Sequence, residues 1–498
     1  MSKSKGRAVR SFSPPRRQTA GRAVAALAVS SLMATSAVAQ SVDLSQWSPE
    51  YIKSIAGTAT YDTAGDCGKV VPNDYAGRVS YWYTGPFEAD PQIMHDIDKQ
   101  FWESFAKAYP NIKVEAQSIT YNELLDKFRT ALLGNAAPMV VRLQILGGVE
   151  FAAKGYLNPL KPEDVGYTSA DFWPGALKSV TWEGTGYGIP TNNETMALIW
   201  NAKLFADAGL DPEKPPATWD DVVAYSKQIH DKLGVSGYGL VAKQNAGNTP
   251  FRFMPMLWAY GGGALDEASD APGYEDVWIN NEGAKKALQA IYQMYVVDKS
   301  VPTSALTNTQ AENQAPFIAG QLGMMIAHPS EYAKMLDLAS KATGSDKAVA
   351  DEVVANMRYG LIPEGPARRA VVFGGSNIHT VKPDYVEGEY DEQAVKALIC
   401  MWTSPEWSTK LAWVSSNPGH LGGFRTEWMK ERLDTIKFLD VTTSMLPNGI
   451  PFPVLPEAPE IMNIIVPDMM QNTLTGAMTV DQAADDAAAK VQELVGGM

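Results

Sequence analysis

The stretch Arg78-Val79-Ser80-Tyr81-Trp82-Tyr83 alternates between the two faces of an extended chain and is rich in β-forming side chains. It stops at Thr84-Gly85-Pro86, a turn-forming triplet. A period of two residues that ends in such a turn predicts a β-strand followed by a loop.

Helical and extended patterns alternate after this strand. Apolar residues recur at helical spacing over 97–105 and again over 121–132, where Gly134 ends the pattern. Residues 112–116 and 139–143 have the alternation and the apolar run of strands. The order β-α-β-α-β predicts a mostly parallel sheet covered by helices.

The same alternation returns in the second half of the chain. Thr218-Trp219-Asp220-Asp221 resembles a capping box at the start of a helix, and residues 287–296 form another amphipathic helix. Residues 323–327 are predicted to form a buried strand that ends at His328, and a further helix is expected from Asp391. The chain is therefore expected to contain two α/β units.

The first 39 residues are predicted to be a signal peptide. Seven lysines and arginines precede an apolar run that starts at Ala23, and no acidic residue occurs before Asp43. Ala37-Val38-Ala39 has the small-x-small pattern of a cleavage site, so we expect export to the periplasm with cleavage near Ala39. Arg16-Arg17 leaves the choice between ordinary secretion and twin-arginine export open. Residues 40–75 are expected to form an extension rather than a domain.

Composition excludes several classes of partner. The net charge is −14 and no basic tract occurs beyond the N-terminus, so nucleic acid is not expected as a partner. No apolar stretch approaches the roughly 20 residues of a spanning helix. The chain has two cysteines, which could pair in an oxidising compartment. The alternatives, a disulfide between Cys67 and Cys400 or two unpaired thiols, remain open at this point.

Catalytic and cofactor motifs are absent from the sequence. It contains no G-x-S-x-G, no H-E-x-x-H and no phosphate-binding loop, and its five histidines are widely separated. We therefore expect no metal, no cofactor and no enzymatic activity. A glycosidase-like pair of carboxylates cannot be recognised among 56 acidic residues, so a secreted carbohydrate-active enzyme remains the rival of another class.

Tryptophan supplies a positive signal. Trp258-Ala259-Tyr260 precedes Gly261-Gly262-Gly263, where the backbone could approach a ligand closely. An indole ring can stack on the apolar face of a sugar, while nearby amides and carboxylates bond its hydroxyls. We therefore expect Trp258 to contact a carbohydrate.

Several longer motifs resemble family 1 extracellular solute-binding proteins of ABC importers, the relatives of the maltose-binding protein. These motifs span roughly residues 78–498. They are Tyr187-Gly188-Ile189-Pro190, residues 196–210, Pro216-Ala217-Thr218-Trp219-Asp220-Asp221, residues 317–324, Gly374-Gly375-Ser376-Asn377-Ile378 and residues 474–479.

The resemblance implies a type II-like periplasmic-binding-protein fold of the α/β class. Two lobes, each a sheet flanked by helices, would be joined by a hinge of several segments. The expected lobes comprise residues 76–190 with 370–424 and residues 191–369 with 425–498. The crossing segments are expected at Pro190–Glu194, near Gly360–Gly375 and near Phe424–Glu427.

Two arguments select candidate ligand-binding residues. Ligands of open α/β sheets bind outside the carboxyl ends of strands, which selects Tyr83, Thr84, Gln144, His328 and Glu331. The implied hinge and the glycine-rich loops add Asn192, Asn193, Glu194, Trp258, Ser376 and Arg425.

The resemblance implies a periplasmic receptor that binds a carbohydrate by hinge closure and delivers it to an inner-membrane ABC permease. We expect it to be a monomer. A second hypothesis is an anionic sugar derivative, sulfonated or phosphorylated. Its cationic partners would be Arg142, Arg252, His328 and Arg425.

Overall fold

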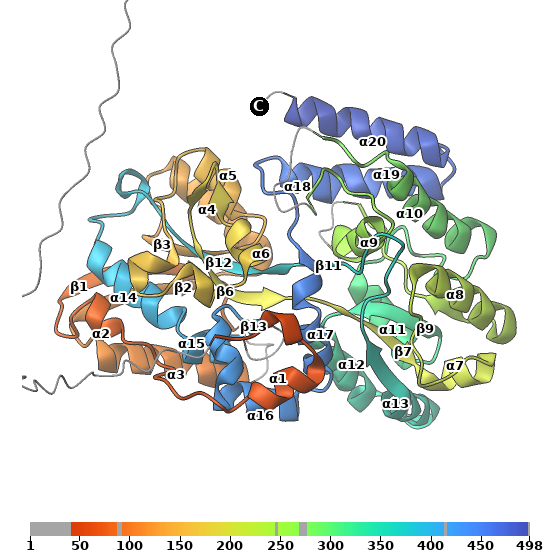
Figure 1. Cartoon of the computed structure of the whole chain (residues 1–498), viewed down its shortest axis with the longest axis horizontal. Helices are drawn as coiled ribbons and strands as arrows, with labels where there is room; N and C mark the ends of the chain where they lie inside the picture. Colours follow the sequence, from red (N-terminus) through yellow and green to blue (C-terminus); the bar gives the residue numbers. More distant parts are fainter. Residues whose placement is uncertain (1–40, 87–91, 245–247, 268–275, 413–415, 497–498) are drawn as a thin grey trace, which may run out of the picture. The chain divides into compact units, whose positions relative to one another are not determined.

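The computed structural model describes residues 41–86, 92–244, 248–267, 276–412 and 416–496. The predicted signal peptide and its cleavage site lie outside these residues. Within the described ranges, two main sheets organise the chain (Figure 1). The larger sheet has the strand order β13 (Asn417–Pro418), β6 (Ile189–Glu194), β12 (Gly374–Thr380), β3 (Val140–Gln144), β1 (Gly77–Tyr83) and β2 (Ile112–Ser118).

The β-α-β-α-β prediction is confirmed by the first half of the larger sheet. β1 pairs in parallel with β2 and with β3. The intervening helices, α3 (Gln92–Ala108) and α4 (Tyr121–Leu133), bury apolar side chains against the sheet together with α14 (Glu392–Trp402). These helices form because their apolar residues fall on one face, which removes a continuous stripe from water.

The other strands of the larger sheet run antiparallel to their neighbours, which the sequence patterns did not predict. β12 pairs antiparallel with β3 and with β6, and β13 pairs antiparallel with β6. At Gly375 the backbone has a φ of 133°, and a Cβ there would lie 2.1 Å from the carbonyl oxygen of Asn192. Glycine is therefore needed for the close approach of β12 and β6.

The smaller sheet has the order β10 (Met357–Gly360), β7 (Ala197–Asn201), β9 (Leu322–Ala327) and β8 (Ser236–Tyr238). Every residue of β9 is buried, as predicted for 323–327. The predicted capping box at Thr218 is confirmed at the start of α8 (Trp219–Leu233). The apolar cluster of this half also includes side chains of α9 (Asn248–Ala259), α10 (Glu282–Tyr292), α19 (Val466–Leu474) and α20 (Val480–Val495).

Three segments leave the larger sheet for the other half of the chain, and two of them join it to the smaller sheet. β6 ends at Glu194 and β7 begins at Ala197, so Thr195 and Met196 join the sheets. Residues 361–373 lead from β10 back to β12, and residues 419–448 leave β13. The second segment contains β11 (Val371–Val372), which pairs in parallel with β14 (Gly449–Ile450), the strand that follows the third segment. The expected lobe limits stay a prediction, although β6 continues unbroken across the boundary expected after residue 190.

The extension after the predicted cleavage site is packed onto the rest of the chain. Ser48 caps α1 (Pro49–Ile55), as the Ser-Pro-Glu sequence indicates. Cys67, in α2 (Cys67–Val70), forms a disulfide with Cys400 in α14, with the two Cα atoms 5.8 Å apart. The structure thus decides between the alternatives that the sequence left open for the cysteines.

No helix within the described ranges is long and apolar enough to cross a membrane.

Candidate functional site

Strand ends of the larger sheet bring several predicted residues together. Ser376 of β12 lies opposite Gln144 of β3 on one side and opposite Asn192 of β6 on the other. Tyr83 ends β1, and Thr84 follows it directly. Asn192 and Ser376 are buried, whereas Gln144 is exposed. These five predicted residues therefore lie at one end of neighbouring strands.

Arg142 of β3 ties these strand ends to one another. Its Nε donates to Thr191 Oγ1 over 2.9 Å, and one Nη donates to Asn192 Oδ1 over 2.6 Å. The other Nη lies 3.4 Å from the carbonyl oxygen of Thr84. Burial lowers the pKa of the Arg142 guanidinium from its usual value, because a charged group loses solvation there. Arg142 was predicted for an anionic ligand only, so its bonds to Asn192 are a new feature of the site.

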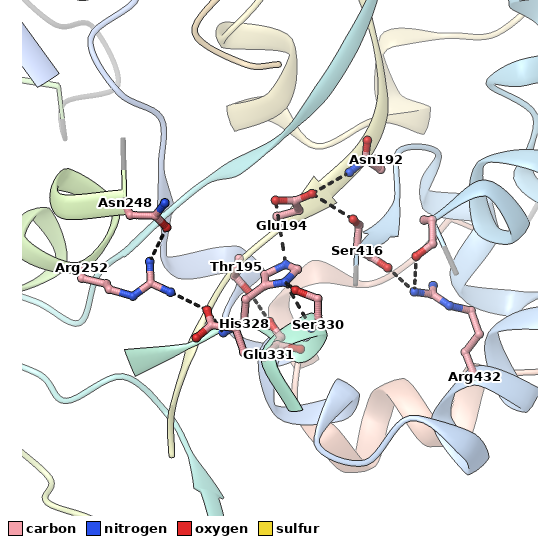
Figure 2. Close-up of polar contacts among 12 residues, drawn as sticks. Asn192, Glu194, Thr195, Asn248, Arg252, His328, Ser330, Glu331, Ser416 and Arg432 are labelled. Atoms are coloured by element: carbon pink, nitrogen blue, oxygen red, sulfur yellow. Dashed lines mark hydrogen bonds and ion pairs between the residues drawn. The ribbon is translucent and has the colours of Figure 1, made fainter. Parts of the chain in front are cut away.

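Glu194 lies at the centre of the polar contacts that connect the two sheets (Figure 2). Its Oε1 accepts from Asn192 Nδ2 over 3.2 Å and from Ser416 Oγ over 3.0 Å. Its Oε2 lies 3.9 Å from Nε2 of His328, which follows β9 of the smaller sheet. The Glu194 side chain is 35% exposed, so solvent and small solutes reach this carboxylate.

His328 and Glu331 begin α12 (Pro329–Lys341) and are held by its capping interactions. The His328 amide donates to Glu331 Oε1 over 3.2 Å, and the Ser330 amide donates to His328 Nδ1. Glu331 also forms a buried ion pair with Arg252 of α9. Burial lowers the pKa of His328 from its ordinary value of 6.5, despite the attraction of the Glu194 and Glu331 carboxylates. The imidazole is therefore neutral at pH 7.

Three buried polar atoms in this cluster have no hydrogen-bond partner among the described residues. They are His328 Nε2, Glu331 Oε2 and Arg252 Nε. Asn193 Oδ1 is also unpaired, but Asn193 lies between Asn192 and Glu194 in β6, so its side chain lies on the opposite face of the sheet, where Nδ2 donates to the carbonyl oxygen of Pro418. Buried polar atoms are normally paired, so an unpaired set at one place indicates a site that a ligand or water completes.

A small cavity lies beside the strand ends. Its volume is about 50 Å³, and Tyr83, Thr84, Arg142, Thr191 and Asn192 are among its lining residues. This volume holds roughly one or two water molecules. All of its lining residues belong to the half with the larger sheet, so this cavity by itself is too small for a sugar.

The Tyr83 side chain, which lines this cavity, is held by hydrogen bonds to two neighbouring residues. Its hydroxyl lies 3.0 Å from a carboxylate oxygen of Asp98, and the Trp102 indole N–H donates to the same hydroxyl. Burial raises the pKa of Tyr83 and also that of Asp98. The Tyr83 hydroxyl is thus already hydrogen-bonded to Asp98 and Trp102, which belong to the same half of the molecule.

Two predicted residues make their contacts with other parts of the molecule and not with this cluster. Trp258 is buried in the apolar cluster of the smaller sheet, and its indole N–H donates to Glu267 over 2.9 Å. Arg425 donates to Thr58 Oγ1 over 3.1 Å and lies 3.5 Å from the carbonyl oxygen of Ser41. Neither shares a hydrogen bond with Glu194 or His328. We therefore leave both out of the cluster that we propose as the site.

A larger cavity of about 640 Å³ lies on another part of the chain, lined by residues 158–161, 184–186 and the first turns of α14. Among its charged groups, Lys396 pairs with Glu392 over 2.6 Å, and Asp164 accepts from the Lys161 amide. We place the site at Glu194 and not here, because His328, Glu331 and Arg252, which have unpartnered buried atoms, are linked to one another and to Glu194.

Sequence patterns missed Thr191 and Ser416. Thr191 precedes two predicted residues, so its place in β6 was a usable signal. Ser416 lies 222 residues from Glu194, and no local pattern points to such a contact.

The comparisons with known proteins identify the family. A family model described as "Bacterial extracellular solute-binding protein" matches residues 88–407, more than half of the chain. The chain belongs to this family. The expected resemblance is thereby confirmed, and solute binding outside the cytoplasm is the property that defines the family.

Individual relatives of this solute-binding protein are distant. A binding protein of Brucella abortus (strain 2308) is 24% identical over 410 residues, which cover 79% of this chain and 90% of the relative. The structure of maltose-bound MalE3 from T. maritima matches with a TM-score of 0.66 and 22% identity, over 84% of this chain and all of the other.

A third relative was solved with a different type of ligand. UgpB from Mycobacterium tuberculosis, in complex with glycerophosphocholine, matches with a TM-score of 0.66 and 17% identity, over 85% of this chain and 99% of the other. At these identities the likeness confirms the expected two-lobed fold, with sheets flanked by helices.

Proposed function

We propose that this solute-binding protein is the carbohydrate-binding component of an ABC importer. It binds a neutral sugar, oligosaccharide or glycoside between its two halves and delivers it to a membrane permease. The observation that carries the proposal is the polar cluster around Glu194 and His328, where unpaired hydrogen-bonding atoms occur without an unbalanced charge.

The charges of the cluster compensate one another. Arg252 pairs with Glu331, and Arg142 is linked to Glu194 through the side chain of Asn192. His328 adds no charge at pH 7, because its pKa is lowered. A charged ligand group enclosed between Glu194, His328 and the Arg252–Glu331 pair would lack a free counter-charge, which is costly at a buried site. A neutral ligand avoids that cost.

The unpaired atoms suit hydroxyl groups. Arg252 Nε is a donor and Glu331 Oε2 is an acceptor, and His328 Nε2 is a donor, because Nδ1 of the neutral ring accepts from the Ser330 amide. A hydroxyl group both donates and accepts, so a polyhydroxylated ligand can satisfy both types. Closure of the two halves would bury the ligand, and no step in this function forms a covalent bond.

The relative solved with maltose supports this ligand class at the level of the fold. Export with cleavage near Ala39, a periplasmic location and a monomeric state remain parts of the proposal. Among the described residues, no three His, Cys, Asp or Glu side chains are grouped to hold a metal ion.

A thermal-shift screen over neutral monosaccharides, disaccharides and polyols tests the proposal, because a tight ligand raises the unfolding temperature by mass action. We expect stabilisation by at least one neutral saccharide, confirmed by calorimetric titration. NMR of the same sugar after prolonged incubation should show it unmodified. Turnover of the sugar would favour the carbohydrate-active enzyme, and no stabilisation by any neutral saccharide would overturn the proposal.

A second ligand class is favoured by one observation. Arg142 makes no ion pair within the described part of the chain, and it lines the small cavity together with Lys410. An anionic sugar derivative could place its charged group against this guanidinium. Glucose 6-phosphate that binds at least tenfold more tightly than glucose would favour this class, and equal or weaker binding would favour a neutral ligand.

A further inference from the structure

The extension at residues 41–71, which we call the N-terminal strap, is fixed to the half that contains the larger sheet. The disulfide joins Cys67 to Cys400 of α14, whose side chains pack against that sheet. The Glu406 amide of α15 (Pro405–Leu411) donates to the carbonyl oxygen of Thr63 over 2.7 Å. One end of the strap is therefore covalently anchored.

The other end of the strap packs on the third connecting segment. Its helix α1 lies against α17 (Leu439–Ser444) (Figure 1). The Trp47 indole N–H donates to the carbonyl oxygen of Thr443 over 2.7 Å, and Lys53 forms an ion pair with Asp440 over 2.6 Å.

Trp47 also contacts two further aromatic rings. Its ring packs edge-on against Trp173, with centroids 5.2 Å apart, and against Phe424, with centroids 4.8 Å apart. Trp47, Ile52 and Ile55 belong to a separate apolar cluster with residues of the second and third connecting segments, including Phe373 and Leu439.

α17 in turn contacts the other half of the molecule. Phe438, which precedes it, stacks on Tyr359 of β10 with ring centroids 4.2 Å apart. Thr195, in the first connecting segment, donates from Oγ1 to the carbonyl oxygen of Thr442. The strap thus links α14, in the half with the larger sheet, to α17 of the third connecting segment. Through Phe438 and Thr442, the α17 region contacts the smaller sheet and the first connecting segment.

We propose that the N-terminal strap restrains the relative movement of the two halves. A hinge motion that displaces α17 from α14 must stretch or break the contacts of Trp47 and Lys53, because the residues directly after α1 are held by hydrogen bonds from the Gly57 and Ala59 amides to Thr426 and Arg425, and Cys67 is held by the disulfide. The strap therefore narrows the range of conformations in the ligand-free protein. This function is separate from ligand recognition and holds whichever solute is bound.

Spin-label distance measurements on the full-length protein without any sugar test this role. One label is placed in each half, at Ala106→Cys in α3 and at Ala348→Cys in α13 (Gly344–Asn356), both at exposed positions. The wild-type strap should give a narrow distance distribution. The double variant Trp47→Ala/Lys53→Ala should at least double its width, because α1 is released from α17.

Two controls and one alternative variant make the test specific. Lys341→Ala removes a lysine–aspartate pair of the same length on α12 and should leave the width unchanged. Labels at Ala106→Cys and Asp384→Cys, both in the half with the larger sheet, should report the same distance in every variant. Trp47→Phe/Lys53→Met keeps an aromatic ring and should widen the distribution if the alanine variant does not fold.

Hydrogen exchange of the α1 amides monitors release of the strap. Faster exchange in α1 together with a wider distribution supports the proposal. Faster exchange in α1 with an unchanged distance distribution overturns the proposal. Unchanged exchange in α1 also overturns it, since the side chains of Trp47 and Lys53 would then not hold α1. No saccharide takes part, so failure here leaves the proposed carbohydrate binding untouched.

Discussion

The carboxylate of Glu194 lies 3.9 Å from Nε2 of His328, and the two residues belong to different sheets. Glu194 ends β6 of the larger sheet, whereas His328 follows β9 of the smaller sheet. A rotation about the connecting segments changes this distance directly. The distance between the two side chains therefore differs between an open and a closed arrangement of the two halves.

Substitution at this pair should weaken binding of the stabilising sugar. We expect Glu194→Gln and His328→Gln each to lower affinity at least tenfold, equivalent to about 1.4 kcal/mol, because each removes an acceptor or a ring from the cluster. Calorimetric titration measures the effect. The matched control Glu213→Gln removes an exposed carboxylate that pairs with Arg358. Affinities within twofold of wild type for both site variants would exclude them from the site.

Trp258 should act on stability rather than on affinity. Trp258→Phe retains the ring in the apolar cluster but removes the hydrogen bond to Glu267, whose pKa burial already raises. We expect a loss of about 1–3 kcal/mol in the free energy of unfolding, because the buried carboxylate loses a donor. Urea denaturation measures it. A tenfold loss of sugar affinity with unchanged stability would instead return Trp258 to the binding site.

Loss of the disulfide should destabilise the protein. Cys67→Ser/Cys400→Ser removes a link between residues 333 positions apart. The free energy of unfolding should fall by about 2–5 kcal/mol, since the cross-link restricts the unfolded chain. Urea denaturation of oxidised wild type and of the variant gives the comparison. Equal midpoints and slopes would show that the bond has no net effect on stability.

Stability should also fall in acid because of buried histidines. Burial lowers the pKa of His379 from 6.5 to about 4, so the unfolded chain binds a proton in this interval that the folded chain does not. The contribution is complete above pH 6.5 and is lost as the pH falls toward 4. His420 has the same direction of shift and the same value.

The variant His379→Gln tests this pH dependence. Between pH 4.5 and 6 the slope of the unfolding free energy should decrease by up to about 1.4 kcal/mol per pH unit relative to wild type. Urea denaturation at several pH values provides the slopes. An unchanged slope would mean that His379 is not the titrating group.

Much of the fold could be predicted because helices and strands follow local patterns. The caps at Ser48 and Thr218 act over three residues, and the structure has both where the sequence indicates. The strand-end rule placed Tyr83, Thr84 and Gln144 correctly at the ends of β1 and β3. Whether they bind ligand stays a prediction.

The sequence alone determined the β-α-β-α-β order after residue 78, several later helices and the family, since side-chain periodicity and motif spacing depend on near neighbours. The tertiary structure decided which distant residues meet. Ser416 donates to Glu194 across 222 positions, and Cys67 reaches Cys400. It also decided that the Trp258 indole is enclosed by apolar side chains, because burial depends on every element packed around a residue and not on the residues beside it in the chain.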